Sequence, residues 1–429
     1  MRPIALLLLG LLTAQEGIDS GYKYSHILDV PNLIFMKKVF CGLDMLEQMD
    51  FSPLRGKRIA VSCGPGSLDN QGRHILDVLQ TQPDITVKYI YVPENGLFAE
   101  DNDRLKLVGK DLYDPVTGAR IIDIFGRNIM PPEWTFQDID AIVIDLVDSG
   151  IRYTTYMTSA TKIFEASASY NIPIYVLDRP NPLGGLKVDG PVVRPAFQSF
   201  EGYHLVPIRH GFTPGEYLLM VNEMGWARNS ARVDLIIIPN VNWKRGMWQD
   251  DTGIPFVSPY PDISSLEALL AFTGMGLLRG TNLNVGHGTD KPYLRFGAPW
   301  ISSLHILEKL DELSLEGVEF RRIRFTPRMR QGEKIIPQYL NTECSGLELR
   351  ITDRLAFDPI ATATAIIIVA HQLYPREFQW AEGDYIDKLF GYDLLRQFTV
   401  KGKPADYLPP LWFHDVLKFA HFRKQFLLY

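Results

Sequence analysis

The fold of this chain is indicated by the segment Arg58-Ile59-Ala60-Val61-Ser62, which is followed directly by Cys63-Gly64-Pro65-Gly66. Its side chains are mostly apolar on both alternating faces, and a cluster of turn-forming residues ends it. Strands that are apolar on both faces belong to parallel sheets covered by helices. The same form recurs three times: Val87–Val92 before Pro93-Glu94-Asn95-Gly96, Ala141–Ile144 before Asp145, and Ile174–Leu177 before Asp178-Arg179-Pro180.

Helical stretches at residues 74–80 and 156–170 separate these predicted strands. A capping box, Thr213-Pro214-Gly215-Glu216, predicts the start of a further helix, and residues 235–239 predict a last strand. Alternation of strand and helix is typical of a doubly wound parallel sheet. We therefore expect an α/β fold in which residues 25–264 form such a sheet.

The chain is too long for a single hydrophobic core. Its 429 residues exceed the roughly 250–300 at which one core stops growing. A stretch rich in Pro, Gly and Asp, from Trp243 to Ser264, predicts a crossover with functional loops. We expect a second, smaller α/β domain over residues 265–429. Its predicted helices are 266–272, 301–313 and 358–373, and its predicted strands are 318–325 and 347–352.

Composition excludes several classes of function. Lys and Arg number 44 against 50 Asp and Glu, a formal charge of -6, and no basic run is dense enough to follow a phosphate backbone. Nucleic acid is therefore not an expected partner. The cysteines Cys41, Cys63 and Cys344 form no CxxC pair, and no HxH or HExxH spacing occurs. We expect no metal and no cofactor, and leave open one disulfide of unknown pairing.

The first 14 residues have the form of a signal peptide. Arg2 precedes the apolar run Ile4–Leu12, and Thr13-Ala14 places small residues before a cleavage point. An N-terminal core strand or helix is the alternative. No later segment reaches the roughly 20 continuous apolar residues that a transmembrane helix needs. We therefore expect an exported protein, periplasmic or extracellular, without a transmembrane segment.

Function is expected in the loops after the predicted strands, because ligands of open parallel sheets bind beyond the carboxyl ends of the strands. Glu94 ends the second strand, where a carboxylate is either a sugar-handling group or an ordinary surface residue. Asp145, Asp148 and Arg152 gather after the third strand, with an internal Asp–Arg ion pair as the alternative. Tyr156 would share a helical face with Arg152.

A dinucleotide site is a third interpretation of the same loops. Gly64 and Gly66 follow a strand, but Asp69 stands where the GxGxxG pattern needs its last glycine. The match is therefore weak. The histidines His210 and His287 lie in glycine-flanked loops, where a histidine is more often structural than catalytic.

Four motifs, taken in order, resemble the NamZ-type exo-β-N-acetylmuramidases, a family long catalogued as a domain of unknown function. They are Leu177-Asp178-Arg179-Pro180-Asn181-Pro182-Leu183-Gly184-Gly185, Pro207-Ile208-Arg209-His210-Gly211, Gly280-Thr281-Asn282 and Gly297-Ala298-Pro299-Trp300. The resemblance runs from about Gly42 to Tyr429. It implies a Rossmann-like domain joined to a smaller α/β domain, with a cleft between them that removes N-acetylmuramic acid from the non-reducing end of peptidoglycan fragments.

The resemblance also implies site residues. The family's catalytic glutamate lies in a Pro-Glu-His-Gly turn, which matches Pro93-Glu94-Asn95-Gly96, so Glu94 is the expected acid/base. Asp148, or otherwise Asp145, is the nearest candidate by strand order for a second carboxylate. The lactyl carboxylate of muramic acid suits a guanidinium fork such as that of Arg152, Arg179 or Arg209. Further substrate-binding residues are expected at Asn95, Tyr156, Asn181, His210, Asn282, His287 and Asp290.

Several polar positions depart from the family pattern. They are Asn95 for His, Val147 for Gln, Thr154 for Tyr, Asp262 for Asn, Arg279 for Glu and His287 for Arg. The changes suggest altered specificity, or loss of activity, on an intact fold. The leading hypothesis is an exported glycoside hydrolase that removes N-acetylmuramic acid or a related amino sugar from peptidoglycan-derived glycans or muropeptides. The alternative is a catalytically inactive cell-wall-glycan binding protein with the same fold.

Overall fold

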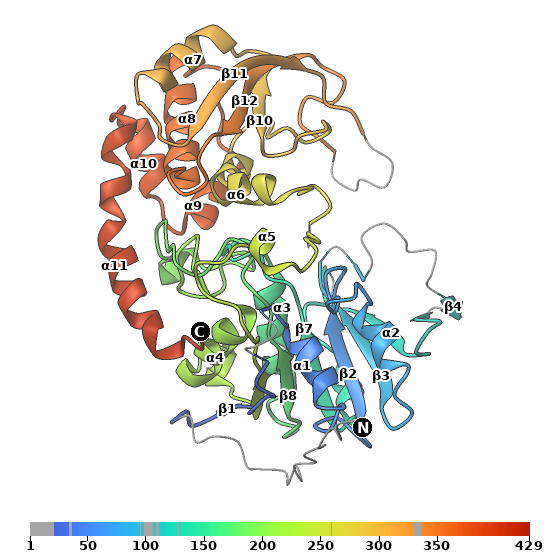
Figure 1. The fold of residues 1–429 in the computed structure, drawn as a ribbon. Helices are drawn as coiled ribbons and strands as arrows, with labels where there is room; N and C mark the ends of the chain where they lie inside the picture. The colour runs from blue at the N-terminus through green and yellow to red at the C-terminus, as the bar shows by residue number, and fades with distance from the viewer. Residues whose placement is uncertain are drawn as a thin grey trace, which may run out of the picture.

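The structure, a computed structural model, describes residues 21–33, 37–94, 96–97, 106–108, 111–126, 128–258, 260–329 and 336–429. The predicted signal peptide at residues 1–14 and the candidate residue Asn95 lie outside these ranges. Figure 1 shows a large domain built on one sheet and a smaller domain stacked against it, with a long helix alongside both.

Among the described residues, nine strands form the sheet of the large domain, in the order β1-β9-β8-β7-β2-β3-β6-β5-β4. Neighbours from β1 to β6 pair in parallel, and β5 and β4 add antiparallel pairs at one edge. The chain moves outward from β2 to β3 and β6, and then returns to β7 on the other side of β2. The predicted doubly wound parallel sheet is therefore confirmed. The strands are β1 (Ser25–Ile27), β2 (Arg58–Cys63), β3 (Thr86–Val92), β4 (Lys106–Val108), β5 (Asp111–Tyr113), β6 (Arg120–Asp123), β7 (Ala141–Asp145), β8 (Ile174–Leu177) and β9 (Leu235–Ile238).

Helices cover both faces of this sheet, as apolar side chains on alternate strand positions require. Ile59 and Val143 pack with helices α1 (Gly42–Gln48) and α2 (Ile75–Leu79) on one face. Ala60 and Ile142, each adjacent in sequence to one of those residues, pack with α3 (Tyr156–Ser167) and α4 (Pro214–Met224) on the other face.

The capping box predicted for α4 is confirmed. The Glu216 N–H donates to Thr213 Oγ1 at 3.2 Å, and the Thr213 N–H donates to Glu216 Oε2 at 3.1 Å. The helix ends at Gly225, whose φ of 62° is the left-handed conformation that glycine adopts at low cost.

The smaller domain carries a three-stranded antiparallel sheet in the order β10-β12-β11, counted over the described residues. Its core includes the apolar helix α8, which Asp358 caps through hydrogen bonds from Ile360 and Ala361. The elements that follow the short helix α5 (Gln249–Thr252) are α6 (Leu266–Met275), β10 (Arg295–Ala298), α7 (Ser303–Asp311), β11 (Val318–Phe325), β12 (Cys344–Ile351), α8 (Pro359–Leu373), α9 (Tyr385–Phe390), α10 (Leu394–Val400) and α11 (Phe413–Phe422). The prediction of a second, smaller domain is confirmed.

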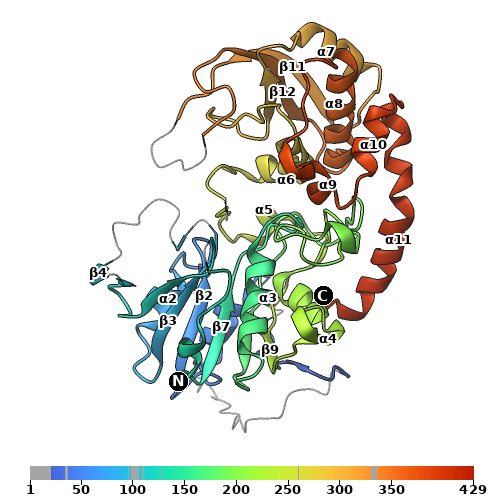
Figure 2. The same cartoon turned by 180° about the vertical axis from the view of Figure 1, so that it is seen from behind.

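Residues 413–429, here called the return segment, leave the smaller domain and run back onto the large one (Figure 2). The segment begins with α11, and its Phe419 and Phe426 belong to the same buried cluster as Phe212 of the large domain. The Trp226 and Phe422 rings stack with their centroids 5.9 Å apart. The large domain is therefore built from both ends of the described chain.

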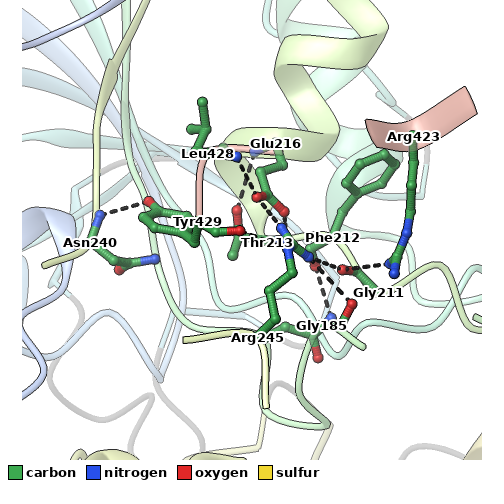
Figure 3. A network of polar contacts seen from close by, with 12 residues as sticks. Gly185, Gly211, Phe212, Thr213, Glu216, Asn240, Arg245, Arg423, Leu428 and Tyr429 are labelled. Atoms are coloured by element: carbon green, nitrogen blue, oxygen red, sulfur yellow. Dashed lines mark hydrogen bonds and ion pairs between the residues drawn. The ribbon is translucent and has the colours of Figure 1, made fainter. Parts of the chain in front are cut away.

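The last residues of the return segment join a polar network beside α4 (Figure 3). The Leu428 N–H donates to Glu216 Oε1 at 2.8 Å, and Arg423 Nη1 donates to the Gly211 carbonyl at 3.1 Å. The buried Tyr429 hydroxyl donates to Asp178 Oδ2 at 2.6 Å and accepts the Asn240 N–H at 2.7 Å.

The structure bears on the question of a transmembrane segment and on the possible disulfide. Over the described residues, no helix is both long and apolar enough to cross a membrane. Cys41, Cys63 and Cys344 are all buried free thiols in the structure.

Candidate active site

Glu94 lies in the turn that follows β3, at the end of the sheet that faces the smaller domain. The Thr155 hydroxyl donates to Glu94 Oε2 at 2.5 Å, and the Thr155 N–H donates to the Tyr260 hydroxyl at 2.9 Å. Burial raises the pKa of the Glu94 carboxyl above its ordinary value, against the Thr155 hydrogen bond and the Arg279 charge, which both lower it. A carboxyl that keeps its proton to a higher pH is suited to protonating a leaving group.

A charged cluster next to Glu94 joins the two domains. Arg279, in the 3-10 helix Gly276–Gly280 of the smaller domain, donates through Nη2 to Glu201 of the large domain and to the Tyr385 hydroxyl. Tyr385 in turn donates to Glu201 Oε1 at 2.9 Å. The Arg279 and Glu201 side chains are 25% and 24% exposed, so solvent reaches part of the ion pair.

Tyr293 is a buried residue whose hydroxyl feels these charges. Its ring centroid is 4.6 Å from that of Phe272, and burial holds the pKa of its hydroxyl above the ordinary value. The charges of Arg279, Asp262, Glu201 and Glu94 all act on the pKa of this hydroxyl. The backbone of Tyr293 has a φ of 63°, a strained value for a bulky residue, and such strain is concentrated at functional sites.

Two departures from the family pattern meet beside Tyr293. His287 Nε2 lies 3.8 Å from Asp262 Oδ2, and the His287 ring packs edge-on against Tyr293 at 5.1 Å between centroids. His287 and Asp262 are 17% and 32% exposed in their side chains. The predicted site residue His287 therefore lies with Asp262 and Tyr293, whereas Asp290 is exposed and pairs with Arg295.

Asp148, the candidate second carboxylate, lies deeper than Glu94. It is 2% exposed and accepts the Gly150 N–H at 2.9 Å and the Thr154 hydroxyl at 3.3 Å. His210 Nε2 lies 3.3 Å from Asp148 Oδ2, so the predicted residues Asp148 and His210 come together as a buried pair. This placement favours a structural role in the loop before α3.

Asp145 and Arg179 form an internal ion pair. Arg179 Nη2 donates to Asp145 Oδ2 at 2.7 Å, its Nε donates to the other carboxylate oxygen, and Nη1 donates to the Leu68 carbonyl at 2.8 Å. Arg179 is 3% exposed. The alternative of an internal Asp–Arg pair is therefore correct for Asp145, although its partner is Arg179 and not Arg152.

Arg152 and Arg209 are also buried. Arg152 donates to the backbone carbonyls of Pro191, Val206 and Leu389, and burial lowers its pKa to about 10. Arg209 donates to the Leu183 carbonyl and lies over the Trp248 ring. None of the three arginines suggested for the lactyl carboxylate presents its fork to solvent, because each is at most 5% exposed.

The remaining predicted residues have identifiable contacts. Asn181 donates to the Phe212 carbonyl at 2.8 Å and accepts the Leu183 N–H at 2.9 Å, and Asn282 donates to the Glu377 carbonyl at 2.8 Å. Both contacts stabilise loops. Tyr156 is buried beside Glu94's neighbours, since its ring stacks on Tyr260 with centroids 6.0 Å apart and planes inclined by 27°.

Sequence reasoning missed Thr155, Tyr260, Glu201 and Tyr385 as site residues. Thr155 lies inside the strand-end loop that was singled out, and Tyr260 lies in the predicted crossover. Glu201 and Tyr385 have no local signal, because only the packing of the two domains brings them together.

The weak dinucleotide interpretation would need space beside Gly66, and the structure leaves little there. Between Gly66, Val147, Arg179 and the loop Pro255–Val257 the structure leaves a cavity of about 20 Å³. A space of this size holds about one water molecule. The loops therefore give no support to nucleotide binding.

Models of a known protein family match both domains. The model described as exo-beta-N-acetylmuramidase NamZ, N-terminal, matches residues 59–267, and the corresponding C-terminal model matches residues 270–429. The chain is 33% identical over 394 residues to the peptidoglycan beta-N-acetylmuramidase NamZ of Bacillus subtilis (strain 168), a match that covers 91% of this chain and 92% of that protein.

Two crystal structures of DUF1343 family proteins from Bacteroides fragilis NCTC 9343 resemble the fold over 91% of this chain and 99% of theirs. One is 25% identical with a TM-score of 0.82, and the other is 28% identical with a TM-score of 0.75. The two-domain arrangement is thus shared with experimentally determined structures.

Proposed function

Because the chain belongs to the exo-β-N-acetylmuramidase NamZ family, we propose that it removes a terminal N-acetylmuramic acid, or a related amino sugar, from peptidoglycan fragments, with Glu94 as acid/base. The observation that carries this proposal is the Glu94 carboxyl, which is partly desolvated at the domain junction and held by Thr155. Glycoside cleavage needs an acid with a raised pKa beside the leaving oxygen.

The mechanism requires Glu94 to give its proton to the glycosidic oxygen as the bond to the sugar breaks. Burial keeps Glu94 protonated to a higher pH, and the Tyr260 hydroxyl and Arg279 favour the carboxylate that forms after transfer. Burial thus favours the protonated form of Glu94, and Tyr260 and Arg279 favour the ionised form.

Glycosidases usually have a second carboxylate, which either activates a water molecule or attacks the sugar carbon. Asp148 was the candidate from the sequence, but it is 2% exposed and hydrogen-bonded on both oxygens. Asp262 and Glu201 lie nearer the open part of the cluster, because their side chains are 32% and 24% exposed. They are the better candidates.

Release of N-acetylmuramic acid from a muramic-acid-terminated disaccharide, and from a chromogenic β-N-acetylmuramide, tests the proposal. The protein should release the sugar and Glu94→Gln should lose activity by at least about a hundredfold, as expected for loss of a general acid. Equal release by both proteins would remove Glu94 from the mechanism.

A second candidate function is a glycan-binding protein without turnover. It is favoured by the changed positions Asp262 and His287, which lie 3.8 Å apart, and Arg279, which pairs with Glu201. Calorimetric binding of the same disaccharide without release of sugar would support this function, and turnover by the unaltered protein would reject it.

Export is part of the proposal, since peptidoglycan lies outside the cytoplasm. It rests on the signal-peptide form of residues 1–14. Expression of the full chain with a fractionation assay should place the mature protein outside the cytoplasm with a cleaved N-terminus. Retention of an intact N-terminus in the cytoplasm would contradict it.

A further inference from the structure

Thr155 is the N-cap residue of α3, but its hydroxyl does not cap the helix. An N-cap threonine ordinarily accepts a hydrogen bond from a backbone N–H of the first turn. Thr213, Ser265 and Ser302 do so at α4, α6 and α7, whereas Thr155 makes no such bond. Its hydroxyl donates instead to Glu94 Oε2 at 2.5 Å. The backbone of Thr155 is itself near-helical, with a φ of -87° and a ψ of -5°, whereas the other three N-cap residues are extended, so the Thr155 hydroxyl is free to contact the candidate acid.

The rest of Thr155 is held firmly. The residue is 3% exposed, its carbonyl accepts the Ser159 N–H at 2.9 Å, and its own N–H donates to the Tyr260 hydroxyl at 2.9 Å. Tyr260 is in turn fixed by stacking on Tyr156. A donor restrained on both sides gives the accepting carboxylate one preferred orientation.

Glu94 lies beyond the end of β3, outside the hydrogen-bonded strand. Its carboxyl contacts the Thr155 hydroxyl. The orientation of the carboxylate therefore depends on its side-chain partners.

We infer that Thr155 is the positioning residue of Glu94, which holds the Glu94 carboxylate in the orientation needed for proton transfer. The inference rests on the proposed glycosidase function and deepens it. Thr155 touches no reacting atom and acts only through Glu94. Its second effect is electrostatic, because a hydroxyl that donates to a carboxylate favours the ionised form.

The test compares Thr155→Val, which removes the hydroxyl at nearly constant shape, with Thr155→Ser, which keeps it. On a chromogenic β-N-acetylmuramide, Thr155→Val should lower kcat roughly 10–100-fold with little change in KM, and Thr155→Ser should recover most of the rate. Thr161→Val is the matched control, because Thr161 lies on the same helix and donates to the Met157 carbonyl instead of to Glu94.

The pH profile separates positioning from a structural effect. Arg279, Glu201, Tyr260 and Tyr293 are the other charged or titratable groups that act on Glu94, and they are unchanged in these variants. Loss of the Thr155 donor leaves Glu94 protonated to higher pH, so the alkaline limb of kcat should move up by about one pH unit in Thr155→Val. It should not move in Thr161→Val.

Thermal unfolding decides whether α3 loses a cap. Thr155→Val should keep the wild-type Tm within about 2 °C, because the lost hydroxyl caps no helix N–H. A large drop in Tm with an unmoved pH limb would overturn the inference and assign Thr155 to folding. Thr155→Ala repeats the comparison without the added methyl group.

A readout independent of turnover keeps this inference distinct from the proposed function. The carbon-13 resonance of the Glu94 carboxyl, identified by its absence in Glu94→Gln, reports its titration directly. A higher midpoint in Thr155→Val than in wild type supports the inference even if the protein cleaves no muramide, which would reject the function alone. Equal midpoints, or an active wild type with equal kcat in Thr155→Val, overturn it.

Discussion

At the scale of single residues, the ionised Glu94 carboxylate destabilises the folded state because it is partly buried. Its pKa is raised chiefly by burial, so the protonated form is favoured in the folded state and stability falls as the pH rises through the folded pKa. Glu94→Gln mimics the protonated form. It should therefore raise the Tm at pH 7, and the gain should disappear near pH 3.5, where Glu94 is protonated in both states. Calorimetry at the two pH values measures this, and an equal gain at both would assign it to another cause.

In the Asp145–Arg179 pair, burial of each charge is offset by the opposite charge and by two hydrogen bonds between the side chains. Asp145→Ala leaves the guanidinium without its counter-ion and should cost about 3–5 kcal/mol in the free energy of unfolding. Glu343→Ala is the control, since its pair with Arg324 is exposed and should be worth about 0–1 kcal/mol. Urea unfolding of the two variants should give clearly different losses, and similar losses would contradict the assignment.

At the scale of elements, the return segment is fastened by Tyr429 to the carboxyl end of β8. Burial raises the pKa of Asp178 to about 6, and the Tyr429 hydroxyl opposes this rise. Tyr429→Phe removes the donor and should cost about 1.5–3 kcal/mol when Asp178 is ionised.

The pH dependence of Tyr429→Phe follows from that raised pKa. Asp178 is protonated in the folded state below about pH 6, so the variant's loss of stability should be larger at pH 8 than at pH 4.5. Urea unfolding at both pH values checks this difference. A loss that is the same at pH 8 and pH 4.5 would show that the hydroxyl does not serve the Asp178 carboxylate.

The elements differ in how well the sequence predicts them. The four apolar runs became β2, β3, β7 and β8, and the α4 cap could be predicted, because both signals are local. The antiparallel edge strands β4 and β5 have three residues each and no distinctive pattern. The return of α11 to the large domain was not predicted either, because its apolar face carries no information about which domain it will cover.

At the scale of the whole molecule, the site is a product of domain packing. Glu94 could be chosen from the strand-end rule and the family resemblance. Its partners Thr155, Tyr260 and Arg279 come from the loop before α3, the crossover and the smaller domain, and no sequence spacing relates them. The three arginines suggested for the lactyl carboxylate are buried in contacts with the protein. The exposure of a charged loop residue therefore cannot be predicted from the sequence alone.

We propose that Glu94, at the junction of the two domains, is the acid/base in the release of a terminal amino sugar. The most direct measurement is the release of free N-acetylmuramic acid from a muramic-acid-terminated disaccharide by wild type and by Glu94→Gln, with both proteins shown to be folded by calorimetry. We predict release by wild type and a loss of at least about a hundredfold in the variant. Undiminished release by folded Glu94→Gln would contradict the claim.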